Sequence, residues 1–127
     1  MTRPTVDNTP ADVEAIFRSL PERLRPERTE DWGGTFHFQI VGADKPDWTV
    51  IVETGVCRVH EGLQGQPACT VKMSEKTFLG IETGQKNPVF AFVKGRIKVS
   101  NVGQMRKYDR AFWKLYERDD LPAPQST

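Results

Sequence analysis

The sequence contains only two cysteines, Cys57 and Cys69, and two histidines, His37 and His60. Two cysteines cannot form a disulfide framework, and neither Cys-x-x-Cys nor His-x-x-x-His spacing occurs, so we expect no metal or other cofactor. No stretch approaches the roughly 20 consecutive apolar residues that a membrane-spanning helix needs. Neither sign of charge dominates, because 18 Lys and Arg residues face 17 Asp and Glu residues. This balance argues against a nucleic-acid binder held by overall charge.

The composition is that of one ordinary globular domain. The chain has 127 residues, of which 37% are hydrophobic and 28% are charged. A chain of this length buries enough surface to form a core without disulfides or a metal. We expect a single domain over residues 9–118, between a flexible N-terminus at 1–8 and a flexible tail at 119–127. With no signal peptide apparent, the expected location is cytoplasmic.

Apolar periodicity predicts a helix, four strands, two short helices, a fifth strand and a last helix. The first helix starts at Thr9-Pro10, where Thr9 caps it, and Pro21 bends or divides it before Pro26 ends it. Alternating apolar residues predict strands at 35–40, 48–53, 57–60, 69–73 and 96–99. This order predicts an α+β fold, a five-stranded and mostly antiparallel sheet with helices covering its apolar face and its other face wet.

The helices after the fourth strand carry most of the remaining apolar bulk. Ser74 is the expected cap of a helix that Gly84 stops, and the short segment 88–93 is apolar on every side, which predicts burial on every side. Met105, Tyr108, Phe112 and Leu115 form one stripe of the last helix. These apolar residues either fill a core or line a ligand pocket, and the pattern alone favours a core.

Positive charge is concentrated near the end of the chain. Residues 94–118 contain eight Lys or Arg residues and only two acids, Asp109 and Glu117. This segment is either a solvated helix face or a surface that meets an anionic membrane or an anionic ligand headgroup. The candidates for the second role are Lys94, Arg106, Lys107 and Arg110.

No set of residues assigns a nucleophile, a base and an oxyanion donor together, so we expect no catalytic residues and no enzyme activity. His37 and His60 are expected to be exposed on the sheet, and both cysteines to be buried thiols. The Gly62-Leu63-Gln64-Gly65 segment is interpreted as a turn.

Several motifs of the chain share the spacing of one known protein family. The match is densest in the second half, where the matching residues are Pro67-Ala68-Cys69-Thr70-Val71-Lys72-Met73-Ser74, Gly84, Asn87-Pro88, Ala91-Phe92, Gly95 and Ile97-Lys98-Val99. In the first half the matching residues are Trp48-Thr49-Val50-Ile51-Val52, Gly55 and the Val59 to Gly62 segment. With these motifs the chain resembles the lipid-carrier domain of the sterol carrier protein type 2 family, over about residues 12–115.

The resemblance implies an apolar tunnel between sheet and helices for a fatty acid, a fatty acyl-CoA, a sterol or a phospholipid. Members of the family occur as free carriers and as accessory domains of larger enzymes. The chain departs from the family at Ser100-Asn101, where a glycine is common, and it lacks a Ser-Lys-Leu ending. The first departure implies a different mouth near the last helix, and the second gives no reason to expect a peroxisome.

We therefore expect non-catalytic binding or transfer of one apolar lipid, with transient membrane-surface contact, by a monomer or homodimer. The expected lipid-binding residues are Phe78, Ile81, Phe90, Phe92, Ile97, Met105 and Phe112. Either Phe90→Trp or Phe112→Trp is expected to block the tunnel. The alternative is a structural module of the same fold, without lipid, that dimerises or docks to an enzyme through Trp32, Trp113 and Tyr116.

Overall fold

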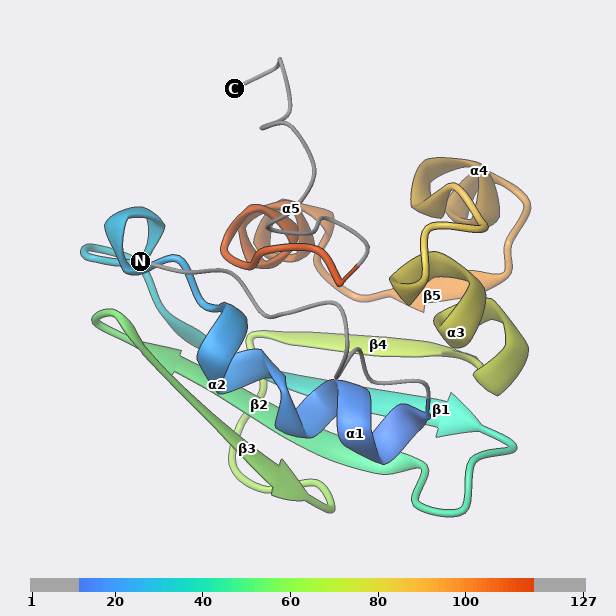
Figure 1. Ribbon diagram of the computed structural model, residues 1–127, viewed down its shortest axis with the longest axis horizontal. Helices are drawn as coiled ribbons and strands as arrows, with labels where there is room; N and C mark the ends of the chain where they lie inside the picture. Colours follow the sequence, from blue (N-terminus) through green and yellow to red (C-terminus); the bar gives the residue numbers. More distant parts are fainter. Residues whose placement is uncertain (1–11, 116–127) are drawn as a thin grey trace.

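The computed structural model describes residues 12–115, which form a five-stranded sheet with helices gathered on one side of it (Figure 1). The strands lie in the order β3-β2-β1-β4-β5, and only the β1–β4 pair is parallel. Their bounds are β1 Gly34–Val41, β2 Asp47–Glu53, β3 Val56–Glu61, β4 Cys69–Ser74 and β5 Ile97–Val99. The predicted α+β class and the mostly antiparallel sheet are confirmed.

The helices follow the predicted order. They are α1 Val13–Arg18, α2 Leu20–Arg23, a 3-10 turn Pro26–Arg28, α3 Glu75–Glu82, α4 Pro88–Val93 and α5 Val102–Arg110. Ser74 caps α3 as predicted, since its side chain accepts a hydrogen bond from the Thr77 amide at 3.1 Å. None of the helices within residues 12–115 is long and apolar enough to cross a membrane.

The first helical segment divides as Pro21 suggested, although the break falls at Ser19. Asp12 caps α1 by accepting a hydrogen bond from the Ala15 amide at 2.8 Å, so the helix begins at Val13 rather than at the predicted start. Thr9 and Pro10 lie outside the described residues. Pro21 occupies the first turn of α2, where its missing N–H costs no hydrogen bond.

A single apolar core fills the space between the sheet and the helices. Phe17 of α1 lies at its centre. Its ring stacks on Trp48 and on Phe78, with 5.1 Å between ring centroids in each case, and meets Phe38 edge-on at 5.3 Å. Phe17 thereby holds α1 against both the sheet and α3.

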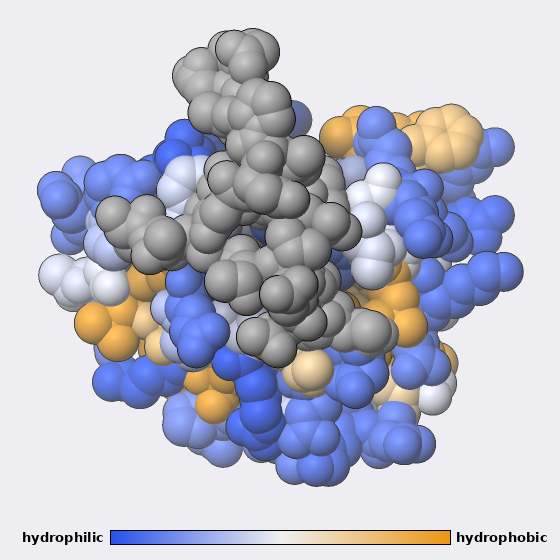
Figure 2. Space-filling view, in the orientation of Figure 1, coloured by the Kyte–Doolittle hydropathy of each residue, from blue (hydrophilic) through white to orange (hydrophobic). Residues whose placement is uncertain are grey.

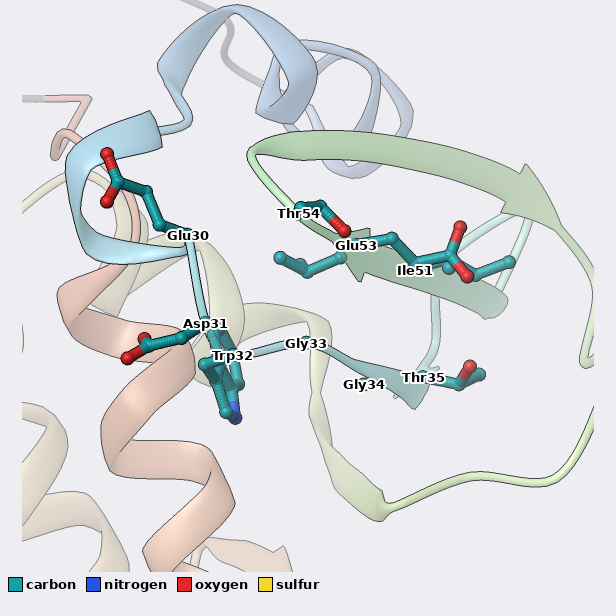
Figure 3. Close-up of a pocket in the computed structure, with 10 residues that line it drawn as sticks. Glu30, Asp31, Trp32, Gly33, Gly34, Thr35, Ile51, Glu53 and Thr54 are labelled. Carbon is teal, nitrogen blue, oxygen red and sulfur yellow. The ribbon is translucent and has the colours of Figure 1, made fainter.

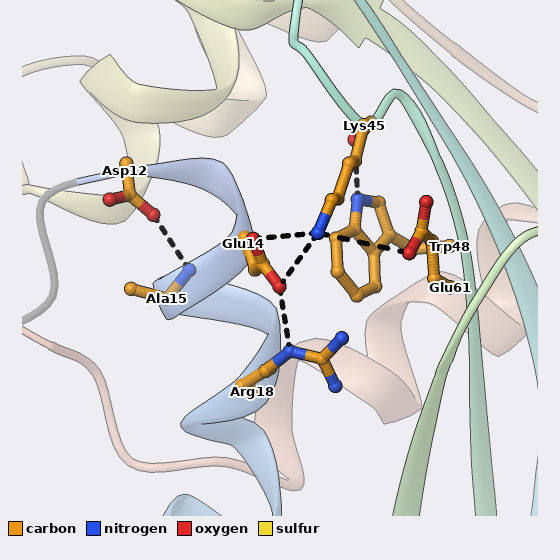
Figure 4. Close-up of polar contacts among 7 residues, drawn as sticks. All are labelled: Asp12, Glu14, Ala15, Arg18, Lys45, Trp48 and Glu61. Carbon is orange, nitrogen blue, oxygen red and sulfur yellow. Dashed lines mark hydrogen bonds and ion pairs between the residues drawn. The ribbon is translucent and has the colours of Figure 1, made fainter.

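Ion pairs bind the outer side of α1 to the sheet (Figure 4). Lys45, in the β1–β2 turn, places its Nζ 3.2 Å from Glu14 and 3.9 Å from Glu61, and Arg18 lies 3.0 Å from Glu14. Hydrogen bonds from Arg18 and Lys45 lower the pKa of Glu14. Because these groups are well exposed, the network orients α1 more than it stabilises the fold.

The second face of the sheet is not uniformly wet, which corrects one expectation. The β3–β4 connection, residues 62–68, crosses this face, because β3 lies at the sheet edge and β4 beside β1. The Thr49 hydroxyl donates to the Gly62 carbonyl at 2.6 Å, and Nε2 of His37 lies 2.7 Å from the Gln64 carbonyl oxygen. His37 is therefore only 9% exposed, so its predicted exposure is wrong, and the predicted turn at 62–65 covers it.

The last helix ends earlier than its apolar stripe suggested. Met105 and Tyr108 belong to α5, which stops at Arg110, whereas Phe112 and Leu115 follow it and are still buried. Backbone hydrogen bonds join this segment to the end of α2, with Arg25 N donating to the Ala111 carbonyl at 2.7 Å. The segment after α5 thus closes the domain against α2.

Candidate functional site

A pocket of about 410 Å³ lies between the sheet and the helices. All five α-helices within residues 12–115 contribute to its wall, together with β1, β4 and β5. Its apolar lining consists of Ile16, Phe17, Leu20, Phe38, Met73, Phe78, Ile81, Pro88, Val89, Phe92, Ile97, Val99, Val102 and Met105. A volume at the lower end of the roughly 300–1,000 Å³ of ligand sites suits a small or slender apolar molecule.

The inner wall of the pocket is aromatic and closely packed. Phe17, Phe38 and Phe78 are each at most 5% exposed and are in ring contact around Phe17. Tyr108 of α5 joins this wall, with its ring centroid 5.3 Å from that of Phe38. Ring contacts of this kind restrict the rearrangement of the side chains that form the wall.

The outer wall is formed largely by α4, and it is exposed. Phe90 is 62% exposed, Val89 69% and Val93 73%, and only Ala91 of this helix is buried. The expectation that residues 88–93 are buried on every side is therefore wrong. The physical reason is that α4 rests on β5 and the pocket rim with one side only. No other element within residues 12–115 packs on its remaining sides. Figure 2 shows apolar side chains at the upper right, where Figure 1 places α4.

The carboxylate of Glu82 lies in the pocket wall. Glu82, at the end of α3, keeps 27% of its side chain accessible and forms an ion pair with the buried Arg23 at 3.6 Å. Burial raises the pKa of Glu82, while the Arg23 guanidinium opposes that rise. Burial also raises the pKa of the Tyr108 hydroxyl, and the negative charge of Glu82 adds to this effect. Glu82 and Tyr108 therefore form a polar region of the pocket wall beside its aromatic rings.

The rim of the pocket on α5 is charged. Arg106, Asp109 and Arg110 line the pocket and are exposed, one or more helical turns along the same side of α5 as Val102. Two guanidinium groups and one carboxylate thus border the opening. Arginine forks bind carboxylates and phosphates through paired hydrogen bonds, so this rim suits an anionic headgroup.

The structure brings together most, but not all, of the residues that the sequence singled out. Phe78, Ile81, Phe92, Ile97 and Met105 line the pocket. Phe112 lies beside a small adjoining hollow of about 50 Å³, and Phe90 points away from both.

Of the candidate headgroup residues, Arg106 and Arg110 line the pocket, whereas Lys94 and Lys107 lie outside it. The role of all these residues in lipid binding stays a prediction.

Several pocket residues had not been assigned to a site from the sequence. Ile16, Phe17 and Leu20 were recognised as an apolar stripe in need of a surface, and that surface proves to include the pocket. Glu82 and Arg23 gave no local signal, because a single charge in an amphipathic helix normally faces solvent. Their pairing depends on residues brought together from α2 and α3.

A second depression, of about 580 Å³, lies where β1 begins and β2 ends (Figure 3). Glu30, Asp31 and Glu53 border it, but Figure 3 shows the carboxylates of Glu30 and Asp31 pointing away from that of Glu53. Within residues 12–115, no group of three or more His, Cys, Asp or Glu side chains is placed to hold a metal ion. This depression therefore offers no converging set of ligands.

Both cysteine thiols lie inside the domain. Cys57 is 6% exposed and Cys69 1%, as expected from their inward positions on the strands. Burial raises the pKa of Cys57 to about 12. A thiol that stays protonated at neutral pH is a poor nucleophile, which agrees with a packing role.

Comparison with known proteins shows that nearly all of the described residues match one protein family. Residues 13–112 match the model of the SCP-2 sterol transfer family. Sterol carrier protein 2 of Gallus gallus is 30% identical over 99 residues, which cover 72% of this chain and 18% of the chicken protein. The chain thus matches less than one fifth of the length of this relative.

Solved structures share the fold at low sequence identity. The sec-alkylsulfatase Pisa1 from Pseudomonas sp. superposes with a TM-score of 0.67 at 18% identity, over 77% of this chain and 16% of the enzyme. The palmitated SCP2L2 from Aedes aegypti superposes with a TM-score of 0.63 at 20% identity, over 84% of this chain and 96% of that protein. The same fold thus occurs both alone and as part of an enzyme.

Proposed function

Because the chain belongs to the SCP-2 sterol transfer family, we propose that it binds the apolar chain of one lipid in the central pocket and carries it chemically unchanged. The observation that carries this proposal is the pocket itself, which is mostly apolar within and charged at its α5 rim. Burial of each methylene contributes about 0.8 kcal/mol, so an acyl chain binds without a buried ion pair. The rim charges then select the headgroup.

A fatty acid or fatty acyl group fits this site better than a bulkier lipid. The pocket volume of about 410 Å³ suits a single chain, and Arg106 and Arg110 stand where a terminal carboxylate would emerge. The palmitated state of the SCP2L2 neighbour supports the same class of ligand. A sterol, with one hydroxyl and no charge, would form no ion pair with either guanidinium group.

Binding of a fluorescent fatty acid tests the proposal. The purified chain should bind the probe saturably with one site per molecule, and unlabelled palmitate should displace it. Val102→Trp introduces bulk at the rim, where Val102 lines the pocket and is 43% exposed, so we expect at least tenfold weaker binding with the fold retained. The matched control is Val41→Trp, at an exposed position outside the pocket, which should bind like the unsubstituted chain.

Two results would contradict the proposal. One is the lack of binding by fatty acid, acyl-CoA and sterol probes alike. The other is equal binding by the Val102→Trp and unsubstituted chains. A stable oligomer that copurifies without lipid would instead favour a structural or enzyme-docking module of the same fold, the alternative that the sequence left open.

A further inference from the structure

Much of the apolar surface of α4 lies outside the core. Phe90 and Val93 are more than half exposed and do not line the pocket, whereas Val89 and Phe92 are exposed on one side and line the pocket on the other. Soluble domains seldom expose four large apolar side chains within one six-residue helix. This group is called the α4 patch and consists of Val89, Phe90, Phe92 and Val93.

The segment of the chain that contains the α4 patch is rich in positive charge. Between Glu82 and Asp109 the sequence has no acidic residue, but it has six basic ones, Lys86, Lys94, Arg96, Lys98, Arg106 and Lys107. Lys94 and Arg96, which directly follow α4, are exposed. The Lys94 ammonium lies 5.2 Å from the centroid of the Phe90 ring. Exposed apolar side chains next to cations are the chemical complement of an anionic lipid surface, which offers acyl chains below a layer of phosphates and carboxylates.

A second copy of the chain fits this surface poorly. A twofold contact places the same patch of both molecules face to face. Lys94 and Arg96 of one molecule would then approach the same residues of the other. Like charges repel, and the chain between Glu82 and Asp109 has no acidic residue that could neutralise them. A bilayer brings the opposite charge, so the charge pattern distinguishes between the two occupants.

The α4 patch is also continuous with the pocket. Pro88, Val89 and Phe92 are part of its outer wall, and Val102 and Arg106 of α5 lie on the same rim. Ala91 is the only buried residue of α4, so a small part of the helix anchors it to the domain. Contact of α4 with a bilayer would therefore place the pocket wall, and not a remote surface, against the lipid.

We propose that α4 docks the domain on anionic membranes, with Phe90 and Val93 inserted among the acyl chains and Lys94 and Arg96 on the headgroup phosphates. Docking would let the lipid of the proposed function pass between the bilayer and the pocket. The membrane contact itself does not depend on a bound ligand. The two activities are therefore measured separately.

Vesicle co-sedimentation of the full chain tests the docking. The probes are phosphatidylcholine vesicles with and without 30% phosphatidylserine. We expect binding to the anionic vesicles, at least tenfold weaker partitioning for the Phe90→Ser/Val93→Ser variant, and loss of the preference for phosphatidylserine in the Lys94→Glu/Arg96→Glu variant. The matched control is Val56→Ser/Leu63→Ser, which removes two exposed apolar side chains from β3 and the β3–β4 connection and should bind normally.

Fatty acid binding and light scattering of the same variants separate the possible outcomes. Phe90 and Val93 lie outside the pocket, so their replacement should leave fatty acid affinity within about twofold of that of the unsubstituted chain. Unchanged vesicle binding by the Phe90→Ser/Val93→Ser variant would overturn the proposal. A dimer that this variant converts to monomers, without vesicle binding by the unsubstituted chain, would also overturn it and assign the patch to self-association. Failure to bind fatty acid would contradict the proposed function and leave the docking result intact.

Discussion

Arg23 is the buried charge on which three parts of the domain converge. Its side chain is 3% exposed. The guanidinium donates hydrogen bonds to the Ser19 hydroxyl at 3.0 Å, the Trp113 carbonyl at 2.9 Å and the Ile16 carbonyl at 3.4 Å. Together with the ion pair to Glu82, these contacts connect the two pieces of the first helical segment to α3 and to the chain beyond α5.

The change Arg23→Met keeps the apolar bulk and removes every one of these bonds. It also leaves the Glu82 carboxylate inside the wall without its guanidinium. Breaking a buried pair in this way costs about 3–5 kcal/mol. Domains of this size are stable by about 5–15 kcal/mol, so we expect a folded but much weakened variant. The matched control is Arg18→Met on α1, which removes an exposed ion pair and should cost less than about 1 kcal/mol.

The cost of Arg23→Met should depend on pH in a defined direction. Without Arg23, the pKa of Glu82 rises further, because burial is already the main influence on it. A carboxyl group with a higher pKa in the folded state than in the unfolded state destabilises the fold as pH rises above the unfolded value. The loss in free energy of unfolding caused by Arg23→Met should therefore be larger at pH 8 than at pH 5. Adding Glu82→Gln to the same variant should remove this pH dependence.

Urea unfolding followed by circular dichroism at pH 5 and pH 8 measures these differences. The reasoning fails if Arg23→Met costs no more than Arg18→Met. It also fails if the deficit is the same at both pH values, or if Glu82→Gln in the Arg23→Met background recovers none of the loss at pH 8.

Two other predictions concern the sheet. Thr54 and Gly55 form the two-residue turn between β2 and β3 with positive φ of 45° and 79°, so Thr54→Asn should stabilise the domain by about 1 kcal/mol in urea unfolding, whereas the β-branched Thr54→Val should give no gain. Because the pKa of Cys57 is raised to about 12 in the fold, the unfolded thiol ionises first as pH rises above about 9. Between pH 9 and pH 11 the free energy of unfolding should therefore fall more steeply for the unsubstituted chain than for Cys57→Ala, by at most about 1.4 kcal/mol per pH unit; parallel curves would contradict this.

The alternating pattern predicted the sheet because each strand has one face on the core. Phe36, Phe38 and Ile40 point to the helices, as their spacing required. The burial of His37 and Thr49 on the opposite face had no such signal. It depends on the path of residues 62–68 across the sheet, and local periodicity carries no information about where a connection crosses.

The residue pattern alone favoured a packed core, and only the family resemblance led us to expect an apolar pocket between the sheet and the helices. Five of the seven expected lipid-binding residues line it, because any apolar residue that faces inward from the late helices borders the same space. Phe90 and Phe112 do not, since α4 turns Phe90 outward and the chain leaves the helical path before Phe112. Phe90→Trp therefore adds bulk at an exposed site away from the pocket, and we no longer expect it to block binding.

Arg23 is a buried charge and α4 carries exposed apolar side chains, so both depart from the usual placement of polar and apolar residues. The buried guanidinium has its compensation inside the domain, in three hydrogen bonds and an ion pair, so its effect is on stability. The exposed apolar side chains of the α4 patch have no covering layer within residues 12–115. Local exceptions in a sequence that is otherwise consistent with its fold tend to mark functional surfaces. We therefore expect the exposed apolar side chains of α4 to be covered from outside the domain, by the anionic lipid surface that the neighbouring positive charges complement.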